Sequence, residues 1–310
     1  MPGKPYAVIA PCFNEEQSIT IFLEKLEQAL ATLPHTFAVI VVDDGSVDDS
    51  LKLLSNFRFS APNLKLQVLK LKFNVGHQMA IYQGLLYVST LQTDDVIIMD
   101  SDGEDDPAAI PLALQQEGYD IVEIKRGKRS EKLTFKLSYR IYKLIFWVIT
   151  GKAMDYGNFC IISRSIVDRI AHTGFIHLPA YLLKQKARRT HITYNRGRRI
   201  RGESKLGMKG LLIHAFKSFI EFGEDLLLLF LKLFLVICIF LVIMLVDLLY
   251  QKFVVHTAIL GWFSTLAMEM LILAGLSLGF FILGILMLNL IHQQNNRDQP
   301  ALYTPIIPNT

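Results

Sequence analysis

The sequence is poor in cysteine. Its 310 residues contain only three cysteines, Cys12, Cys160 and Cys238, and no two of them form a CxxC pair. This spacing excludes a zinc knuckle and a disulfide framework, and it indicates a reducing compartment. Residues 1–5 also carry no apolar signal segment ahead of the first predicted strand. We therefore expect the polar part of the chain to lie in the cytosol.

The glycine-rich loops that bind nucleotides in two widespread folds are missing as well. No GxxxxGK(S/T) motif occurs, and residues 10–14, which follow the first predicted strand, read APCFN rather than GxGxxG. A P-loop nucleotide hydrolase and a dinucleotide-dependent oxidoreductase are therefore disfavoured.

Charge and hydrophobicity are unevenly distributed along the chain. Hydrophobic residues make up 52% of it, and beyond residue 226 they dominate while charges almost vanish. Ten lysines and arginines but a single acid, Glu203, lie between Lys184 and Lys209, directly before that apolar part. Such a basic stretch indicates a phosphate partner, on a ligand or at a membrane surface. The alternative is a solvated basic face without a ligand.

The polar part alternates short apolar runs with helical patterns. The predicted strands are 6–10, 38–42, 64–71, 96–99 and 121–124, and the predicted helices are 17–33, 48–57, 76–91 and 107–116. Ser46 and Asp49 form a capping-box-like start to the second helix. Strands that alternate with helices predict an α/β fold with a mostly parallel sheet covered on both faces.

Polar residues follow each of the first four predicted strands. In an open parallel sheet, ligands bind outside the carboxyl ends of the strands. Each group by itself is ordinary turn chemistry, but the agreement of four groups indicates one binding site. The groups are Pro11, Asn14 and Glu15; Asp43 and Asp44; Asn74, Gly76 and His77; and Asp100 and Asp102.

The fourth group suits a divalent metal. Three carboxylates, those of Asp100, Asp102 and Glu104, fall within five residues after a buried strand. Carboxylate oxygens can hold Mg²⁺ or Mn²⁺ and leave positions open for a diphosphate, whose developing charge the ion would neutralise. Glu104 or Asp105 is a candidate for a further ligand. Asp43 or Asp44 is a candidate acceptor for hydrogen bonds from a nucleobase or ribose.

The remaining segments predict membrane association. Residues 132–150 and 206–224 form amphipathic helices rich in aromatic and basic residues, which suit a membrane interface or, alternatively, packing on the sheet. Residues 226–250 and 258–291 are each long enough to cross a bilayer. Gly275 and Gly279 form a GxxxG spacing that permits close helix contact and is compatible with a homo-oligomer.

These segments define a domain scheme. We expect a cytosolic catalytic domain at 1–205, an interfacial amphipathic helix at 206–225, a transmembrane hairpin at 226–291 and a cytosolic tail at 292–310. Basic residues cluster before the first span, so both ends of the hairpin are expected in the cytosol. The expected location is a bacterial inner membrane or its equivalent, and no nucleic-acid partner is expected.

Several motifs together resemble those of GT-A (Rossmann-like) family 2 glycosyltransferases. The early ones are Pro11-Cys12-Phe13-Asn14-Glu15-Glu16, Val42-Asp43-Asp44-Gly45-Ser46, Asn74-Val75-Gly76-His77 and Asp100-Ser101-Asp102. The later ones are Gly157-Asn158-Phe159, Tyr194-Asn195-Arg196 with Arg199, Gly202, Ser204 and Lys205, then Gly261-Trp262 and the tail from Arg297 to Tyr303. The later set is similar to the polyprenyl-phosphate branch, which includes dolichol-phosphate mannosyltransferases and undecaprenyl-phosphate glucosyltransferases.

The resemblance implies roles for individual residues. The residues expected to bind the metal are Asp100, Asp102 and Glu104. The residues expected to take part in catalysis are Asp102, Asp155, Arg129 and Arg199. Donor or phosphate binding falls to Pro11, Asn14, Glu15, Asp43, Asp44, Asn74, Arg126, Arg196, Ser204 and Lys205. Two positions depart from the family pattern: Gly103-Glu104 replaces Leu-Gln after the second aspartate, and Asn158 replaces the aspartate of Gly-Asp-Phe. Asp155 lies close to Asn158 and could substitute as a base, although an anionic lipid phosphate needs none.

The resemblance implies an inverting, metal-dependent transfer of one sugar from a UDP- or GDP-linked donor to a polyprenyl phosphate. One alternative is a processive polysaccharide synthase, but its Gln-x-x-Arg-Trp motif is absent from the sequence. The other alternative is a membrane-anchored scaffold that binds a nucleotide sugar without turnover. The product distinguishes the three functions: the transferase makes a single glycosyl-lipid, the synthase makes a polymer, and the scaffold makes no product.

Overall fold

The computed structural model describes residues 3–127, 133–153, 157–195, 208–256, 261–295 and 301–306. The chain forms two compact units. The first contains Met1–Ile141, Ala153–Glu221 and Asp298–Thr310, and the second contains Tyr142–Lys152 and Phe222–Arg297.

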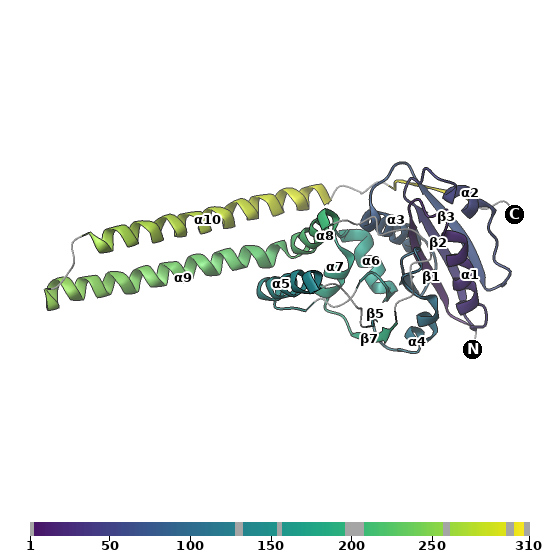
Figure 1. Ribbon diagram of the computed structural model, residues 1–310, viewed down its shortest axis with the longest axis horizontal. Coiled ribbons are helices and arrows are strands. Elements are labelled where there is room, and N and C mark those ends of the chain that lie inside the picture. The colour runs from purple at the N-terminus through teal and green to yellow at the C-terminus, as the bar shows by residue number, and fades with distance from the viewer. Residues whose placement is uncertain are drawn as a thin grey trace. The chain divides into compact units, whose positions relative to one another are not determined.

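The first unit is built on one mixed sheet (Figure 1). Its strands, within the described residues, are β1 (Pro5–Cys12), β2 (Thr36–Asp43), β3 (Leu64–Leu71), β4 (Asp95–Ile98), β5 (Ile121–Arg126), β6 (Cys160–Ser163), β7 (Arg189–Tyr194) and β8 (Tyr303–Ile306). They lie in the order β7-β5-β6-β4-β1-β2-β3-β8. Strand β6 runs antiparallel to β4 and β5, and β8 runs antiparallel to β3, while the other pairs are parallel. The prediction of a mostly parallel sheet is therefore confirmed.

Helices cover both faces of this sheet, as predicted. They are α1 (Ile19–Leu30), α2 (Ser50–Asn56), α3 (His77–Ser89), the 3₁₀ turn η1 (Pro107–Ala109), α4 (Ile110–Leu114), α6 (Arg164–Thr173) and α7 (Leu178–Lys184). The first unit also contains α8 (Met208–Glu221), which contacts α7. Helix α5 (Leu133–Thr150) runs from the first unit into the second. The predicted helix over 107–116 is divided into η1 and α4, which carry prolines at their starts.

Helix α2 begins close to the predicted position but is capped differently. Asp49 precedes the helix, and its side chain makes no capping hydrogen bond. Instead, Oδ1 of Asp48 accepts a hydrogen bond from the backbone N–H of Ser50 at 3.0 Å. The expected capping box of Ser46 and Asp49 is therefore not formed.

The strands contribute side chains to two hydrophobic layers, one on each face of the sheet, because successive side chains of a strand point to opposite faces. In β1, Val8 and Ala10 pack with α1 and η1, whereas Ala7 and Ile9 pack with α3 and α6. Gly84 allows α3 to approach the sheet closely, since a Cβ there would lie 2.7 Å from Cγ2 of Ile9. This packing fixes where the first residues of α3 meet the carboxyl ends of the strands.

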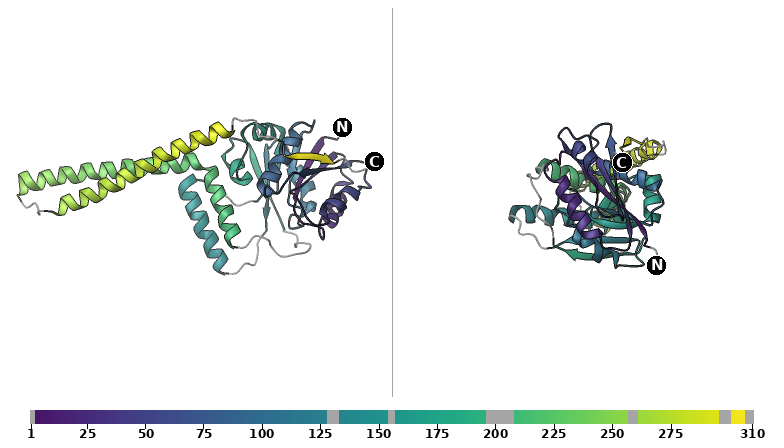
Figure 2. Two further views of the ribbon diagram at one scale, coloured as in Figure 1. Left: turned by 90° about the horizontal axis from the view of Figure 1, so that it is seen from above. Right: turned by 90° about the vertical axis from the view of Figure 1, so that its right-hand side faces the viewer.

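The second unit contains a helical hairpin of α9 (Gly223–Tyr250) and α10 (Trp262–Asn295), which lie side by side (Figures 1 and 2). The π-helical turn η2 (Gln251–Val255) extends α9. Two segments are long and apolar enough to cross a membrane, Gly223–Val255 and Ser264–Met287. Most of their side chains are not buried by protein, which is the exposure expected of lipid-facing helices.

Contacts between the two hairpin helices use small and polar residues of α10. Ser277 donates a hydrogen bond to the carbonyl of Phe230 at 2.8 Å, and Gly284 makes room for Leu227. Gly275 and Gly279 have no described atom within 4 Å of a built Cβ. The GxxxG spacing therefore faces away from α9 and does not serve the contact inside the hairpin.

The chain returns to the first unit after the hairpin. Strand β8 pairs with β3, and Leu302 accepts a hydrogen bond from the N–H of Lys72 at 3.1 Å. The N–H of Leu302 donates to Oε1 of Gln83 on α3 at 2.9 Å. The residues before and after the hairpin thus belong to the same compact unit, and β8 covers the edge of β3.

Candidate active site

The ends of β1 and β2 are joined by the residues that the sequence analysis placed in a nucleotide site. The N–H of Asn14 donates to Oγ of Ser46, and Oδ1 of Asn14 accepts from the N–H of Val47, both at 2.9 Å. Asn14 adopts a left-handed backbone conformation with φ 54°, which asparagine tolerates better than most residues. The N–H of Glu15 donates to Oγ of Ser50 at 2.8 Å, and the Ser18 hydroxyl donates to the Glu15 carboxylate.

Asp44 joins the end of β2 to the start of α3. Its Oδ1 accepts a hydrogen bond from the N–H of Val75 at 2.7 Å, and its Oδ2 accepts from the N–H of Gly76 at 2.9 Å. The side-chain amide of Asn74 donates to the carbonyl of Asp44 at 3.1 Å. Burial raises the pKa of Asp44, although these two backbone hydrogen bonds act in the opposite direction. Asp44 and Asn74 therefore hold the loop before α3 in place.

Two side chains at these strand ends are fully buried. Asp43 is 0% exposed, and its Oδ2 has no hydrogen-bond partner among the described residues. Burial raises the pKa of the Asp43 carboxyl. Burial likewise raises the pKa of the Cys12 thiol, so Cys12 is not a thiolate nucleophile at neutral pH. The predicted contact between Asp43 and a nucleotide stays a prediction.

The acidic loop after β4 is tied to β1 and folded by its own side chains. Ser101 donates to the carbonyl of Pro11 at 2.6 Å, so this loop lies beside the end of β1. Oδ2 of the buried Asp105 accepts from the N–H of Asp100 at 3.0 Å, and Oδ1 of Asp102 accepts from the N–H of Glu104 at 2.9 Å. Asp105 thus shapes the loop from inside.

A chain of polar contacts reaches this loop from α7. Oε1 of Gln78 accepts from the N–H of Leu178 at 2.7 Å, and Nε2 of Gln78 donates to Oδ1 of Asn158 at 3.0 Å. Nδ2 of Asn158 lies 2.9 Å from Nε2 of His77, which lies 3.1 Å from Oδ1 of Asp100. Burial tends to lower the pKa of His77, but the charges of Asp100 and the neighbouring aspartates reverse this, and the net direction is upward.

These contacts bring the four predicted groups to one edge of the sheet. Asn14 joins the end of β1 to the loop after β2, and Asp44 joins the end of β2 to the start of α3. His77 joins α3 to the acidic loop after β4, and Ser101 joins that loop to the end of β1. The sequence analysis did not identify the roles of Gln78 and Ser101. The sequence offers one indication of a role for Gln78, because it is a polar residue inside a largely apolar helix pattern.

A divalent ion held by carboxylates of the acidic loop stays a prediction. Over the described part of the chain, no three His, Cys, Asp or Glu side chains gather closely enough to hold a metal. Magnesium is commonly bound through one or two carboxylates, with substrate phosphates and water completing its shell. Asp100 and Asp102 match that donor chemistry. Glu104 as a third ligand stays a prediction.

The described part of the basic stretch is largely engaged within the protein. Lys184 donates to the carbonyl of Glu221 at 3.0 Å, and Nε of Arg188 lies 3.5 Å from Oδ2 of Asp120. Arg189 donates to the carbonyl of Leu182 at 2.6 Å and pairs with Glu123 at 3.7 Å. These three side chains thus make contacts within the first unit.

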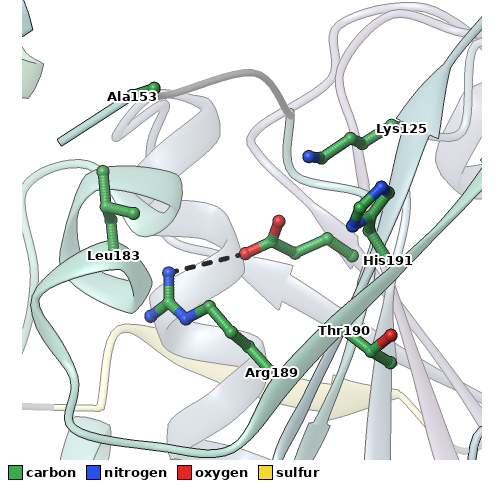
Figure 3. Close-up of a pocket in the computed structure, with 7 residues that line it drawn as sticks. Lys125, Ala153, Leu183, Arg189, Thr190 and His191 are labelled. Atoms are coloured by element: carbon green, nitrogen blue, oxygen red, sulfur yellow. Dashed lines mark ion pairs between the residues drawn. The ribbon is translucent and has the colours of Figure 1, made fainter.

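A cavity of about 200 Å³ lies between β5, β7 and α7 (Figure 3). In the figure, a dashed line marks the ion pair that Arg189 makes with Glu123, and Lys125 and His191 project from the adjacent strands. It is lined by Glu123, Lys125, Ala153, Leu183, Arg189, Thr190 and His191. None of these lining residues was predicted as a site residue, and Lys125 immediately precedes the predicted Arg126.

The other predicted residues lie outside what the structure describes. Arg126 ends β5, and its side chain is not described. The residues that fall outside the described ranges are Arg129, Asp155, Arg196, Arg199, Ser204 and Lys205. Their roles in catalysis and phosphate binding stay predictions.

Known proteins resemble this chain in sequence and in fold. The undecaprenyl-phosphate 4-deoxy-4-formamido-L-arabinose transferase of Yersinia enterocolitica serotype O:8 is 31% identical over 219 residues, which cover 67% of this chain and 64% of that protein. The chain thus matches less than two thirds of that relative's length.

Two solved structures share the fold. Mannosyl-3-phosphoglycerate synthase from Rubrobacter xylanophilus has a TM-score of 0.52 at 13% identity, covering 72% of this chain and 74% of its own. Glucosyl-3-phosphoglycerate synthase from Mycobacterium tuberculosis, solved with Mg²⁺ and UDP, has a TM-score of 0.52 at 16% identity, covering 72% and 79%.

The family model named glycosyl transferase family 2 matches residues 7–171, which is more than half of the chain. This stretch contains all four strand ends and the acidic loop described above. The chain therefore belongs to glycosyltransferase family 2.

Proposed function

We propose that this glycosyltransferase moves one sugar from a nucleotide sugar, UDP- or GDP-linked, to the phosphate of a polyprenyl lipid, with inversion at the sugar. The observation that carries the proposal is the presence, in one chain, of an acidic sheet edge and an apolar helical hairpin. The similar Yersinia protein is named as an undecaprenyl-phosphate sugar transferase, which supports a lipid-phosphate acceptor.

The acidic loop is the proposed place of the donor diphosphate. Asp100 and Asp102 would hold Mg²⁺ or Mn²⁺, and the bound ion would neutralise charge on the departing nucleoside diphosphate. The loop is held against β1 by Ser101 and against α3 by His77, so the carboxylates are positioned before substrate arrives. Positioning and charge neutralisation supply most of the rate in this scheme, because a lipid phosphate is already anionic at neutral pH.

The hairpin is the proposed membrane anchor. The chain leaves the first unit after Glu221 and rejoins it at β8, and this arrangement supports a two-span hairpin whose ends lie on the same side of a bilayer. The predicted basic residues before the first span favour the cytosolic side. The catalytic edge would then act on the phosphate of a lipid embedded in the same membrane.

The decisive experiment uses membranes that contain the full chain. They are incubated with a panel of nucleotide sugars and a polyprenyl phosphate, with and without Mn²⁺ or Mg²⁺, and the lipid product is identified by mass. We expect a single glycosyl-lipid from the wild type and none from Asp102→Ala. The control Asp49→Ala removes a carboxylate whose side chain is 70% exposed, and it should leave transfer unchanged. Full transfer by Asp102→Ala, or a polymeric product, would contradict the proposal.

A further inference from the structure

The cavity between β5, β7 and α7 collects its charged side chains on one face of the sheet. Strands β5 and β7 are parallel neighbours, and their register places Glu123 opposite His191 and Ile121 opposite Arg189. Side chains alternate along a strand, so residues two apart share a face. Lys125 therefore shares a face with Glu123, and Arg189 shares one with His191. In the sheet order, β6 separates these strands from β4 and its acidic loop.

Arg189 and Glu123 form a charge-balanced wall of the cavity. Nη2 of Arg189 donates to the carbonyls of Leu182 at 2.6 Å and Gln185 at 3.4 Å, at the end of α7. Its Nη1 lies 3.7 Å from Oε1 of Glu123, whose side chain is 7% exposed. A carboxylate withdrawn from water to this extent is costly unless a cation lies beside it. The charge of Arg189 thus compensates that of Glu123, and both side chains are fixed before any ligand arrives.

Lys125 brings a positive charge that no described carboxylate offsets. It lines the cavity and is partly buried, and it makes no hydrogen bond or ion pair with the residues that the structure describes. The same holds for His191, which projects from the adjacent strand (Figure 3). A lysine ammonium offers three N–H donors, and an imidazole offers at least one. The cavity therefore combines a net positive charge with donors that the rest of the described chain does not use.

We propose that this cavity binds a small anion that carries a phosphoryl group, with Lys125 and His191 as its direct ligands. The several oxygens of a phosphoryl group can accept hydrogen bonds from both side chains at once, and a lysine ammonium is a common ligand of phosphate. The volume of about 200 Å³ lies below the range of about 300–1,000 Å³ that is typical of larger organic ligands. The cavity thus suits a phosphoryl group on a small body rather than a whole nucleotide.

This site differs in kind from the proposed donor site. There, a diphosphate would meet carboxylates through a divalent ion, whereas here the protein itself supplies the positive charge. Anion binding to the cavity should therefore need neither Mg²⁺ nor Mn²⁺. The inference does not rest on the proposed donor or on the proposed lipid acceptor.

The test follows inorganic phosphate at His191. The full chain, labelled with ¹⁵N-histidine and purified in detergent with a chelator, is titrated with phosphate at constant pH and ionic strength, and His191→Gln assigns the resonance. We expect a saturable shift of the His191 signal in the wild type. Lys125→Met should need about 10-fold more phosphate for half-saturation, the effect of losing one charge-assisted hydrogen bond. Lys125→Arg keeps the cation and should retain binding.

A matched control and a variant of opposite sign keep the test decisive. Lys65→Met makes the same change at an exposed lysine of β3 and should bind phosphate as the wild type does. Glu123→Gln removes a negative charge beside the cavity, so it should bind phosphate about 5-fold more tightly. A variant that merely misfolds would not bind more tightly. The absence of a saturable shift in the wild type, or equal binding by Lys125→Met and the wild type, would overturn the proposal.

Two further arms identify the source of the phosphoryl group. Glycerol 3-phosphate and phosphatidic acid carry the same group on a soluble molecule and on a lipid. In nanodiscs of phosphatidylcholine, glycerol 3-phosphate should shift the His191 signal as inorganic phosphate does, which would support a soluble ligand. A shift caused by phosphatidic acid in the nanodisc, without added phosphate, would support a lipid headgroup at the same site. If neither compound shifts the signal, the proposal fails, whether or not the chain forms a glycosyl-lipid.

Discussion

Asp44 provides the sharpest test of how the candidate site is held together. Its two carboxylate oxygens accept one backbone hydrogen bond each, from Val75 and Gly76. In Asp44→Asn, one oxygen becomes an amide nitrogen that faces an N–H group, so one hydrogen bond is lost and two donors oppose each other. We therefore expect the variant to lose stability even though its shape is nearly unchanged.

The size of the effect follows from the contacts. A hydrogen bond to a charged group contributes about 1.5–3 kcal/mol to stability. Val75 and Gly76 are only partly buried, and burial raises the pKa of Asp44, so removing its charge also removes a desolvation penalty. Both factors place the loss near the lower end, at about 2 kcal/mol. For a domain of this size, that corresponds to a fall in melting temperature of about 4–8 °C.

The assay is thermal unfolding of the full chain in detergent at neutral pH, followed by circular dichroism. Asp49→Asn is the matched control, because the Asp49 side chain is 70% exposed and lies 4.0 Å from its nearest cation, on Lys52. Its stability should stay within about 0.5 kcal/mol of the wild type. Equal melting temperatures for Asp44→Asn and Asp49→Asn would refute the structural role of Asp44.

Two further predictions concern the hairpin and the end of α8. Gly284→Ala should destabilise the hairpin by about 1–3 kcal/mol in detergent melts, because its Cβ would lie 1.8 Å from Cδ2 of Leu227. Gly279→Ala meets no described atom within 4 Å and should lose no stability, or gain up to about 1 kcal/mol from the better helix propensity of alanine. Equal losses in both variants would contradict the packing described above. Burial raises the folded-state pKa of Glu221, so wild-type stability should fall as pH rises from about 4.5 through that raised value. Glu221→Gln cannot titrate at this position, so its stability relative to the wild type should rise with pH over the same range, as measured by thermal unfolding at a series of pH values. Parallel stability curves for the two proteins would contradict the raised pKa of Glu221.

Most helices and strands of the α/β half could be predicted because the burial of their side chains produces a recognisable local pattern of apolar and polar residues. Strands β1 and β2 are almost wholly buried and read as apolar runs. Strand β3 alternates, leaves Lys65 and Lys70 exposed, and matches the predicted 64–71. The strands that were missed are short or weakly apolar. Strand β6 has four residues, and β7 is the alternating sequence RTHITY at the edge of the sheet. Strand β8 is stabilised by β3, more than 200 residues earlier in the chain, which no local window reveals.

The candidate site was predictable in its location but not in its bonding. The sequence places acidic and amide side chains after four strands, and parallel strands deliver their ends to one edge. It does not reveal which of these side chains are used by the protein itself. Asp44 and Asn74 bind the backbone before α3, and Asp105 folds the acidic loop. Such partners depend on how loops from different strands meet.

The sequence by itself determined the α/β class, the acidic edge and the apolar hairpin, because periodicity and composition record how much of each segment is withdrawn from water. Only the tertiary structure decided that the GxxxG face points away from α9 and that Asn158, 81 residues from His77, turns its amide nitrogen toward that ring. Hydrogen bonds are directional and short, so their partners are selected by the packing of distant segments, which local sequence does not encode.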